Sequence, residues 1–563
     1  MSARGTGRIV DMTAPIDPVT MQVVGNYCRT VTNEVEVAMI RAAYSPVTKE
    51  AFDCSAGIID PSSEFWALAD AIPVQCSVLA TVHRAMLENY GKTLEPGDIL
   101  FTNDPWSGCP HLNDFVSIAP VFAEDEIIAY IGTLMHQTDV GGKTPGSMPA
   151  DATEIFQEGF RVPVQRLFTR DGFNEPVLNI LLANSRTPTS FRGDLSAQVA
   201  GTRLGIRRMQ EAVERFGKER FVIHARAHVD YSERRVRNQL RQLKTGSYSA
   251  ERHVDGPDYD SADQGISVVA DVEIGDGQVS VDFSRSSEQV PRPLNCVLSN
   301  AIAPSLVALR CMLDNDLPMN GGLQRALTVT CAPGSILNPV LPAPVGARAV
   351  VASLAYDCVL ECLGQASPDK ACATSSGGTT MPFIWAPQTT PGEEPRILVD
   401  NSLTGGTGAR SSADGMDAVD NTVTNAMNYP AEMLEQEYPA IVERHELRDG
   451  SGGAGEYRGG EGLRRVLRFL APGNLSLRGH RHQYPPPGFA GGEPGAPSLF
   501  SLERGGVTQP IPPQSSAIAT EVGDRFIAET PGGGGYGPVA ERRESKNPLS
   551  RLGILASNEA KDD

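Results

Sequence analysis

The segment NDPWSGCPHLNDFVSIAPVFAEDEIIAYIGTLMHQTDVGG, residues 103–142, contains the pattern His-x-x-Asp twice. The first copy is His111 with Asp114, and the second is His136 with Asp139. Histidine is rare in this chain, with nine copies in 563 residues, so two copies inside this segment form an unusual concentration. The segment is therefore the starting point for predicting both the fold and the functional site.

The residues between the two motifs predict a pair of antiparallel strands. Apolar runs at 116–122 and 127–134 are separated by the polar residues 124–126. Antiparallel neighbours place the start of the first strand beside the end of the second. The two motifs would then converge at one end of the hairpin. Two imidazoles with carboxylates suit a divalent transition metal such as zinc, manganese or iron, so the hypothesis is a metal site.

Two alternatives compete with this hypothesis. A single His-x-x-Asp is more often a surface pair or a helix cap, so the metal site depends on the duplication and on the predicted convergence. The string from Gly141 to Thr144 resembles the end of a phosphate-binding P-loop. That motif needs a glycine five positions before Gly142, where this chain has Gln137, so the P-loop is excluded.

Other carboxylates and histidines are weaker candidates. Asp53 precedes a predicted strand and is a possible third or fourth metal ligand. Glu154 and Glu158 are four residues apart and would share one helix face, from which either could act as a general base or complete a metal shell. The alternative for both is a solvated helix face. His224 and His228 have the same spacing but lack a His-Glu-x-x-His pattern, so surface positions are expected for them.

The composition limits the possible partners and the compartment. The chain is 40% hydrophobic and 21% charged, as is usual for globular proteins, and its net charge of −19 argues against binding to nucleic acid or an anionic membrane. No signal peptide and no segment of membrane-spanning length is expected. The ten cysteines form no C-x-x-C pair, and those in apolar contexts, such as Cys311, are expected in the core. We expect a cytoplasmic protein with reduced thiols.

The pattern along the chain predicts a mixed α+β fold. Helices are predicted at 18–44, 78–90, 301–313 and 352–365, with a charged, exposed or partner-facing helix pair between 195 and 243 and a β-hairpin at 268–283. The glycine-rich segments 451–462 and 530–537 are interpreted as loops that approach a ligand or another chain. We divide the chain into an amino-terminal metal-site region (1–247), a central α/β region (248–430) and a Gly-rich carboxyl-terminal region (431–563), whose last residues, 541–563, are predicted to be frayed.

Other catalytic classes have little support in the sequence. It contains no G-x-S-x-G elbow, no protein-kinase motif set and no complete nucleotide-binding loop. If ATP drives the chemistry, another subunit must bind it.

Together, several motifs spread along the chain resemble the hydantoinase B/oxoprolinase family. This family comprises the non-ATPase subunits of ATP-dependent hydantoinases, oxoprolinases and lactamases, and related subunits of acetone and acetophenone carboxylases. The resemblance extends over nearly the whole chain, and its motifs lie at residues 41–45, 52–55, 102–114, 136–142, 145–147, 154–159, 184–186, 193–195, 458–462 and 531–537.

The resemblance implies four metal ligands, Asp53, His111, Asp114 and His136. It also makes Asp139 a candidate for orienting a ligand histidine or for acid/base chemistry, and Asp139 or Glu154 could move the proton. One residue departs from the pattern: Gln75 stands where many relatives have histidine. The chain also ends soon after the last glycine-rich motif, without a further strand-like segment that many relatives carry.

The resemblance further implies a division of labour. A hydantoinase A-type ATPase partner would phosphorylate a hydantoin, 5-oxoproline or lactam, and this subunit would hydrolyse the activated ring at a zinc, manganese, iron or cobalt site, as part of a hetero-oligomer. The alternatives are a subunit of an ATP-dependent ketone carboxylase and a non-catalytic scaffold for the ATPase subunit. Bicarbonate-dependent product formation would distinguish the carboxylase from the hydrolase.

Overall fold

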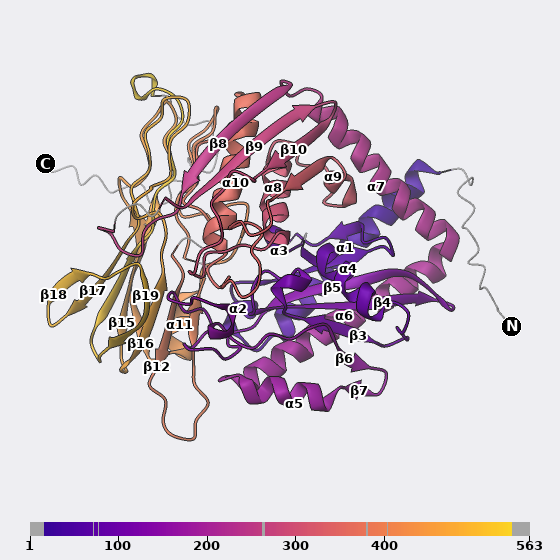
Figure 1. Ribbon diagram of the computed structural model, residues 1–563, viewed down its shortest axis with the longest axis horizontal. Coiled ribbons are helices and arrows are strands. Elements are labelled where there is room, and N and C mark those ends of the chain that lie inside the picture. The colour runs from indigo at the N-terminus through magenta and orange to yellow at the C-terminus, as the bar shows by residue number, and fades with distance from the viewer. Residues whose placement is uncertain are drawn as a thin grey trace, which may run out of the picture.

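The protein has a mixed α+β fold, as Figure 1 shows for the computed structural model, and its described residues form four β-sheets. The structure describes residues 16–70, 72–76, 78–261, 265–378, 381–401 and 403–542. The predicted α+β class is confirmed. The predictions for the first fifteen residues and for most of the tail, 543–563, lie outside the described residues.

The largest sheet carries the opening segment of the sequence. Its seven strands lie in the order β2-β1-β5-β4-β3-β6-β7, and every neighbouring pair is antiparallel. The predicted hairpin is confirmed as β4 and β5 at the centre of this sheet. The strands are β1 (Cys54–Ile59), β2 (Phe65–Leu68), β3 (Ile99–Thr102), β4 (Asp114–Ala123), β5 (Glu126–His136), β6 (Gln165–Thr169) and β7 (Gly172–Phe173).

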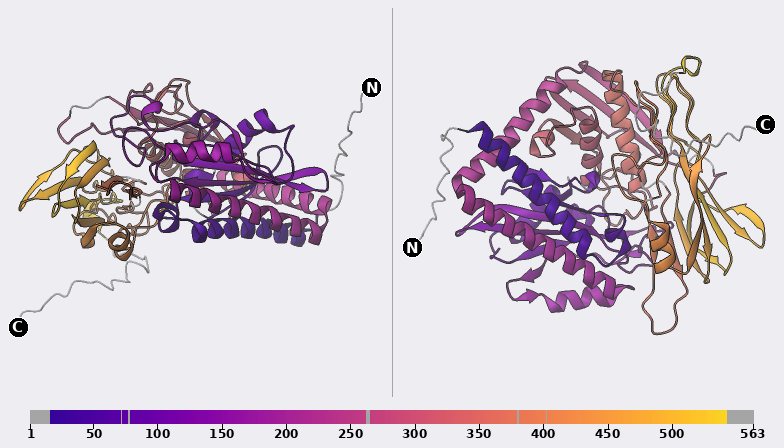
Figure 2. Two further views of the ribbon diagram at one scale, coloured as in Figure 1. Left: turned by 90° about the horizontal axis from the view of Figure 1, so that it is seen from below. Right: turned by 180° about the vertical axis from the view of Figure 1, so that it is seen from behind.

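Helices cover both faces of this sheet because its strands are apolar on both sides. Ile58 packs with α1 (Pro18–Ala42), α6 (Pro188–Phe216) and α7 (Lys218–Leu240), whereas the next residue, Ile59, packs with α4 (Val78–Tyr90). The view from behind in Figure 2 shows α1 and α6 running across one face. The predicted helices at 18–44 and 78–90 are confirmed. Two histidines were predicted wrongly: His224 and His228 are buried, because α7 packs beneath α1 instead of lying free on the surface.

The central part of the chain forms a smaller sheet, in the order β11-β10-β9-β8, packed on two apolar helices. The predicted hairpin and both helices are confirmed. The helix α10 is apolar enough over its 18 residues to cross a membrane by length and composition, contrary to expectation, but 83% of it is buried as a core helix. Cys311, at the end of α8, is exposed rather than in the core. The elements are β8 (Gly246–His253), β9 (Ser267–Gly275), β10 (Gln278–Asp282), β11 (Leu327–Thr330), α8 (Ser299–Cys311) and α10 (Ala349–Ala366).

Two further sheets share one apolar core in the carboxyl-terminal part. Their strand orders are β13-β12-β16-β19 and β14-β15-β20-β17-β18, and Figure 1 shows them together at one end of the molecule. β12, from the central part of the sequence, pairs with β16 of this later segment, and β13 pairs with β12 at the edge of the sheet. The strands are β12 (Phe383–Pro387), β13 (Leu398–Asp400), β14 (Ala440–Arg448), β15 (Gly462–Phe469), β16 (Gly473–Arg478), β17 (Leu499–Arg504), β18 (Val507–Pro510), β19 (Gln514–Thr520) and β20 (Arg525–Glu529).

The remaining elements are short. They are the helices α2 (Pro46–Lys49), α3 (Pro73–Cys76), α5 (Glu175–Asn184), α9 (Gly321–Gln324) and α11 (Ala431–Glu437), and the 3₁₀ turns η1 (Pro105–Ser107), η2 (Ile155–Gln157) and η3 (Val539–Glu541).

The glycine-rich segments contact one another. Successive N–H groups of Gly533, Gly534 and Gly535 donate to three different segments, at the carbonyls of Gly460, Thr374 and Glu493, each at 2.9 Å. Donation in three directions over three residues matches an extended helix with three residues per turn. Within the described residues, the close approach expected for a ligand or another chain is therefore made by this chain's own backbone.

Candidate metal centre

Three of the expected ligands lie at one end of neighbouring strands. Asp114 is the first residue of β4, and the register places it directly opposite His136, the last residue of β5. Asp53 immediately precedes β1, the neighbour of β5 on the other side, and the N–H of His136 donates to the carbonyl of Asp53 at 3.1 Å. The strand order β1-β5-β4 therefore brings together residues that are far apart in sequence.

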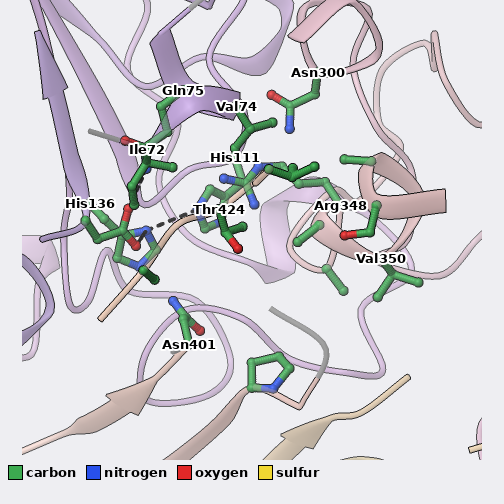
Figure 3. Close-up of a pocket in the computed structure, with 18 of the residues that line it drawn as sticks. Ile72, Val74, Gln75, His111, His136, Asn300, Arg348, Val350, Asn401 and Thr424 are labelled. Carbon is green, nitrogen blue, oxygen red and sulfur yellow. Dashed lines mark hydrogen bonds and ion pairs between the residues drawn. The ribbon is translucent and has the colours of Figure 1, made fainter. Parts of the chain in front are cut away.

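His111 joins them from the loop before β4. Its Nε2 lies 3.3 Å from Asp114 Oδ1 and 3.3 Å from Nδ1 of His136, and the latter nitrogen lies 3.0 Å from the same Asp114 oxygen. We call these three residues the histidine–aspartate cluster, and Figure 3 labels its two histidines. All three side chains are buried, so water does not compete for their donor atoms.

The geometry of the cluster fits a bound divalent cation. Donors about 2.0–2.2 Å from one ion lie about 3.0–3.5 Å from each other, which matches the three distances. Burial, together with the nearby Arg348 charge, lowers the pKa of His111 to about 3, so its imidazole is neutral and offers a lone pair. The outward ring nitrogens, Nδ1 of His111 and Nε2 of His136, have no hydrogen-bond partner among the described residues. Two nitrogens and a carboxylate oxygen can hold zinc, manganese, iron or cobalt.

Asp53 lies at the margin of this cluster. Its Oδ2 is 3.8 Å from Nδ1 of His136, and its other oxygen accepts a hydrogen bond from the amide of Gln75. The hydroxyl of Ser55 in turn donates to Gln75 Oε1 at 3.1 Å. Burial raises the pKa of Asp53. Gln75, which stands where the resemblance predicts histidine, thus fixes the orientation of the Asp53 carboxylate through its side-chain amide.

Arg348 was missed by sequence reasoning. It stands at the start of α10, and its Nη2 donates to Asp114 Oδ2 at 2.7 Å, across 234 positions of sequence. Burial alone would raise the pKa of Asp114, but His111 and Arg348 hold it well below its usual value. The carboxylate is therefore ionised, with one oxygen facing the histidines and the other facing the guanidinium.

The two predicted proton carriers are placed differently. Asp139 is buried, and its oxygens accept four hydrogen bonds: from the N–H groups of Gly141, Gly146 and Arg186, and from the Arg186 guanidinium. Glu154 is partly buried, and no helix follows it beyond the single turn η2. Neither residue is among those that line the cavity beside the cluster. Their catalytic roles stay predictions.

Glu158 does not share a helix face with Glu154, because η2 is only three residues long. Its carboxylate is buried and accepts hydrogen bonds from the N–H groups of Val345 at 3.0 Å and Gly346 at 2.8 Å. It thereby fixes the turn that leads into α10.

A cavity of about 60 Å³ lies beside the cluster. One water molecule takes up roughly 10–15 Å³ of such a cavity, so the space has room for an ion and a small ligand. In Figure 3, His136 lies at the left and His111 nearer the centre, with Asn300 and Arg348 beyond His111. Arg478, at the end of β16, also lines the cavity. No local sequence signal marks Asn300 or Arg478, because only the packing of distant segments brings them here.

Comparison with known proteins gives a consistent family. The sequence profile of hydantoinase B/oxoprolinase matches residues 17–539. A protein of Pseudomonas sp. (strain NS671) that is assigned as one subunit of a D-/L-hydantoinase is 30% identical and is matched over 94% of this chain and 92% of its own length. A 5-oxoprolinase of Dictyostelium discoideum is 29% identical over 95% of this chain, which spans 41% of that longer protein.

Two solved structures share the fold. An ATP-dependent caprolactamase from Pseudomonas jessenii has a TM-score of 0.86 at 27% identity, covering 96% of this chain and 94% of the other. A nucleotide-free acetone carboxylase also has a TM-score of 0.86, covering 95% of this chain and 78% of the other. At 18% identity, the second likeness shows the fold alone.

Proposed function

The chain belongs to the hydantoinase B/oxoprolinase family, and from that membership we propose that it is the metal-bearing subunit of an ATP-dependent cyclic amidohydrolase. The observation that carries the proposal is the histidine–aspartate cluster, whose three buried donor atoms lie 3.0–3.3 Å apart beside a cavity. In this proposal the amino-terminal region holds the metal, and the substrate is a hydantoin, 5-oxoproline or lactam.

The proposed partner is an ATPase subunit of the hydantoinase A type. The relative from Pseudomonas sp. (strain NS671) is by name one subunit of a larger enzyme, and the chain spans 41% of the Dictyostelium 5-oxoprolinase, which leaves room in that protein for a second activity. An amide is a poor electrophile, so prior phosphorylation by such a partner would make ring opening feasible.

The residues of this chain would divide the work at the site. His111, Asp114 and His136 would hold the cation, with Asp53 as the adjacent fourth carboxylate. When bound, the cation supplies an acidified water and stabilisation of a developing oxyanion. Arg348 holds Asp114 ionised and fixed, and the apolar side chains of Ile72, Val74 and Val423 limit water in the cavity. Asp139 or Glu154 would move the proton.

Metal analysis of the purified chain tests the proposal. We expect about one transition-metal ion per chain in the wild type, and its loss in folded His111→Ala and His136→Ala variants, because each substitution removes one of three donors. His83→Ala is a suitable histidine control for metal content, since His83 is buried elsewhere against Tyr130. A wild-type chain that holds no metal, even when supplemented and assembled with its partner, would contradict the proposed function.

A ketone carboxylase is the second candidate, favoured by the fold shared with acetone carboxylase. Activity of the reconstituted complex separates the two: ring opening without bicarbonate supports the hydrolase, and bicarbonate-dependent consumption of a ketone supports the carboxylase. Full activity with Asp114→Ala would instead favour a non-catalytic scaffold.

A further inference from the structure

Arg478 is a buried cation with no carboxylate beside it. Among the described residues, three arginines are 5% exposed or less, of which Arg465 pairs with Asp400 at 2.7 Å and Arg481 pairs with Asp357. Arg478 has no carboxylate within 4.0 Å among the described residues, and it is the one of the three that lines the cavity. A buried charge without a counter-charge is costly, so its retention beside a cavity points to an anion that enters there.

Neutral acceptors hold the Arg478 guanidinium in place. Its Nη1 donates to the Gly346 carbonyl at 3.0 Å and contacts the sulfur of Met148, and its Nη2 donates to Asn401 Oδ1 at 3.0 Å. Burial lowers the pKa of Arg478 to about 9, so it remains charged at neutral pH. The nearest acidic group to act on it is Glu158, whose two oxygens are already engaged by backbone N–H groups.

The same end of the cavity contains two further features that favour an anion. The 18-residue helix α10 begins there, and no side chain caps its first turn, so the positive end of the helix dipole is open to the cavity. The side chain of Asn300 is 1% exposed, and its Oδ1 has no hydrogen-bond partner among the described residues. Figure 3 shows its amide pointing into the space between His111 and Arg348. An amide that can turn either its oxygen or its NH₂ toward a ligand is suited to such a position.

We propose that Arg478, Asn300 and the start of α10 form an oxyanion-binding subsite next to the histidine–aspartate cluster. A substrate would place its reacting ring at the cluster and its negatively charged oxygens at the subsite. As a substrate contact, the subsite rests on the proposed function. As a site for an anion, it stands on the buried charge and the unpartnered amide alone.

Two sources could supply the same chemistry. One is a carboxylate that the substrate carries on its ring, as 5-oxoproline does. The other is the phosphoryl group that the ATPase partner would attach. Both present oxygens that accept charge-assisted hydrogen bonds from a guanidinium.

Anion binding to the full-length chain, depleted of metal with a chelator, tests the subsite directly. We expect inorganic phosphate, acetate or both to bind in calorimetric titration, with affinity about 10- to 100-fold weaker in Arg478→Gln, since one charge-assisted bond is lost. Asn300→Ala, which removes an amide whose Oδ1 has no hydrogen-bond partner among the described residues, should also weaken binding and serves if Arg478→Gln does not fold. Arg396→Gln is the matched control, because Arg396 donates to the carbonyl of Glu437 away from the cavity. The inference is overturned if neither anion binds the wild type, or if both cavity variants bind as the wild type does.

His111→Ala separates this inference from the proposed function. The variant should lose metal but keep anion binding. If the wild-type chain holds no metal but its anion binding depends on Arg478, the subsite is retained and the proposed metal function fails. In the assembled enzyme, comparing 5-oxoproline with 2-pyrrolidone, which lacks the carboxylate, identifies the source. A higher KM for 5-oxoproline alone in Arg478→Gln assigns the carboxylate, whereas a lower kcat/KM for both assigns the phosphoryl group.

Discussion

Asp139 and Asp114 occupy equivalent positions in the two His-x-x-Asp motifs, yet their carboxylates do different things. Asp114 faces the histidines and Arg348, whereas Asp139 ties together Gly141, Gly146 and Arg186. The reason is positional: Asp114 begins a strand, and Asp139 lies in the loop beyond the end of one. The contacts of Asp139 are therefore those of a residue that stabilises a loop.

Replacing Asp139 by Ala should destabilise the whole fold. Three backbone N–H groups would lose their acceptor, and the Arg186 guanidinium would lose its carboxylate while keeping three backbone carbonyl acceptors, so we expect the free energy of unfolding to fall by about 3–5 kcal/mol. Chemical denaturation followed by circular dichroism measures this change. Glu154→Gln is the control, with a change within about 0.5 kcal/mol, because the Glu154 side chain makes no capping hydrogen bond to η2. An Asp139→Ala chain as stable as the wild type would contradict the structural role.

Glu36 on α1 should make stability depend on pH. Burial, with a contribution from Asp70, raises its pKa to about 7 from an ordinary value near 4.5. The folded state therefore favours the protonated form, and its contribution to stability is complete below pH 4.5 and is lost as the pH rises through 7. Glu36→Gln should be as stable as the wild type at pH 4.5 and, after allowance for partial exposure, more stable by about 1 kcal/mol at pH 8.

Thermal unfolding at the two pH values measures the effect of Glu36→Gln. Glu34→Gln on the same helix is the control: Glu34 pairs with Arg208 at 2.7 Å, so its replacement should give no gain at pH 8. Equal melting temperatures of the Glu36→Gln variant and the wild type at pH 8 would refute the assignment.

Among the elements, the helices and hairpins could be predicted. The packing of the glycine-rich segments 451–462 and 530–537, which we call the glycine layer, could not. Helix α4 spans the residues that its apolar periodicity predicted, and β9 and β10 follow from alternation around a glycine turn. The segments at 451–462 and 530–537 have no apolar periodicity, since their order comes from backbone hydrogen bonds between distant parts of the chain. A single sequence does not encode which segments those are.

A side chain in this glycine layer should prevent folding. A Cβ on Gly533 would lie 1.9 Å from the carbonyl oxygen of Thr407, and the other atoms it would meet, Thr407 C at 2.3 Å and Gly408 N at 2.7 Å, are also backbone. We expect Gly533→Ala to cost more than about 4 kcal/mol or to abolish soluble expression. Gly275→Ala is the control, because its Cβ would meet only Thr245 at an ordinary 3.7 Å. Similar yields and melting temperatures for both variants would show that the layer tolerates expansion.

At the scale of the molecule, the sequence predicted the candidate metal donors but not the cavity beside them. His111, Asp114 and His136 converge through one hairpin, which is a local consequence of strand pairing. Arg348 and Arg478 come from α10 and β16, and their approach depends on how three separate cores pack. The cavity therefore forms only when these parts of the chain are packed together, so a ligand bound in it should stabilise all of them.

Metal binding should consequently protect distant elements from hydrogen exchange. A cation that binds only the assembled site stabilises every element the site requires, so added zinc or manganese should slow exchange at the ends of β4 and β5 and also at the start of α10, which Arg348 links to Asp114. Exchange followed by mass spectrometry measures this by segment. His111→Ala should show no metal-dependent change anywhere, and the exposed strand β18 should respond in neither protein. Protection confined to β4 and β5 would mean that the amino-terminal sheet holds the metal without help from the central part of the chain.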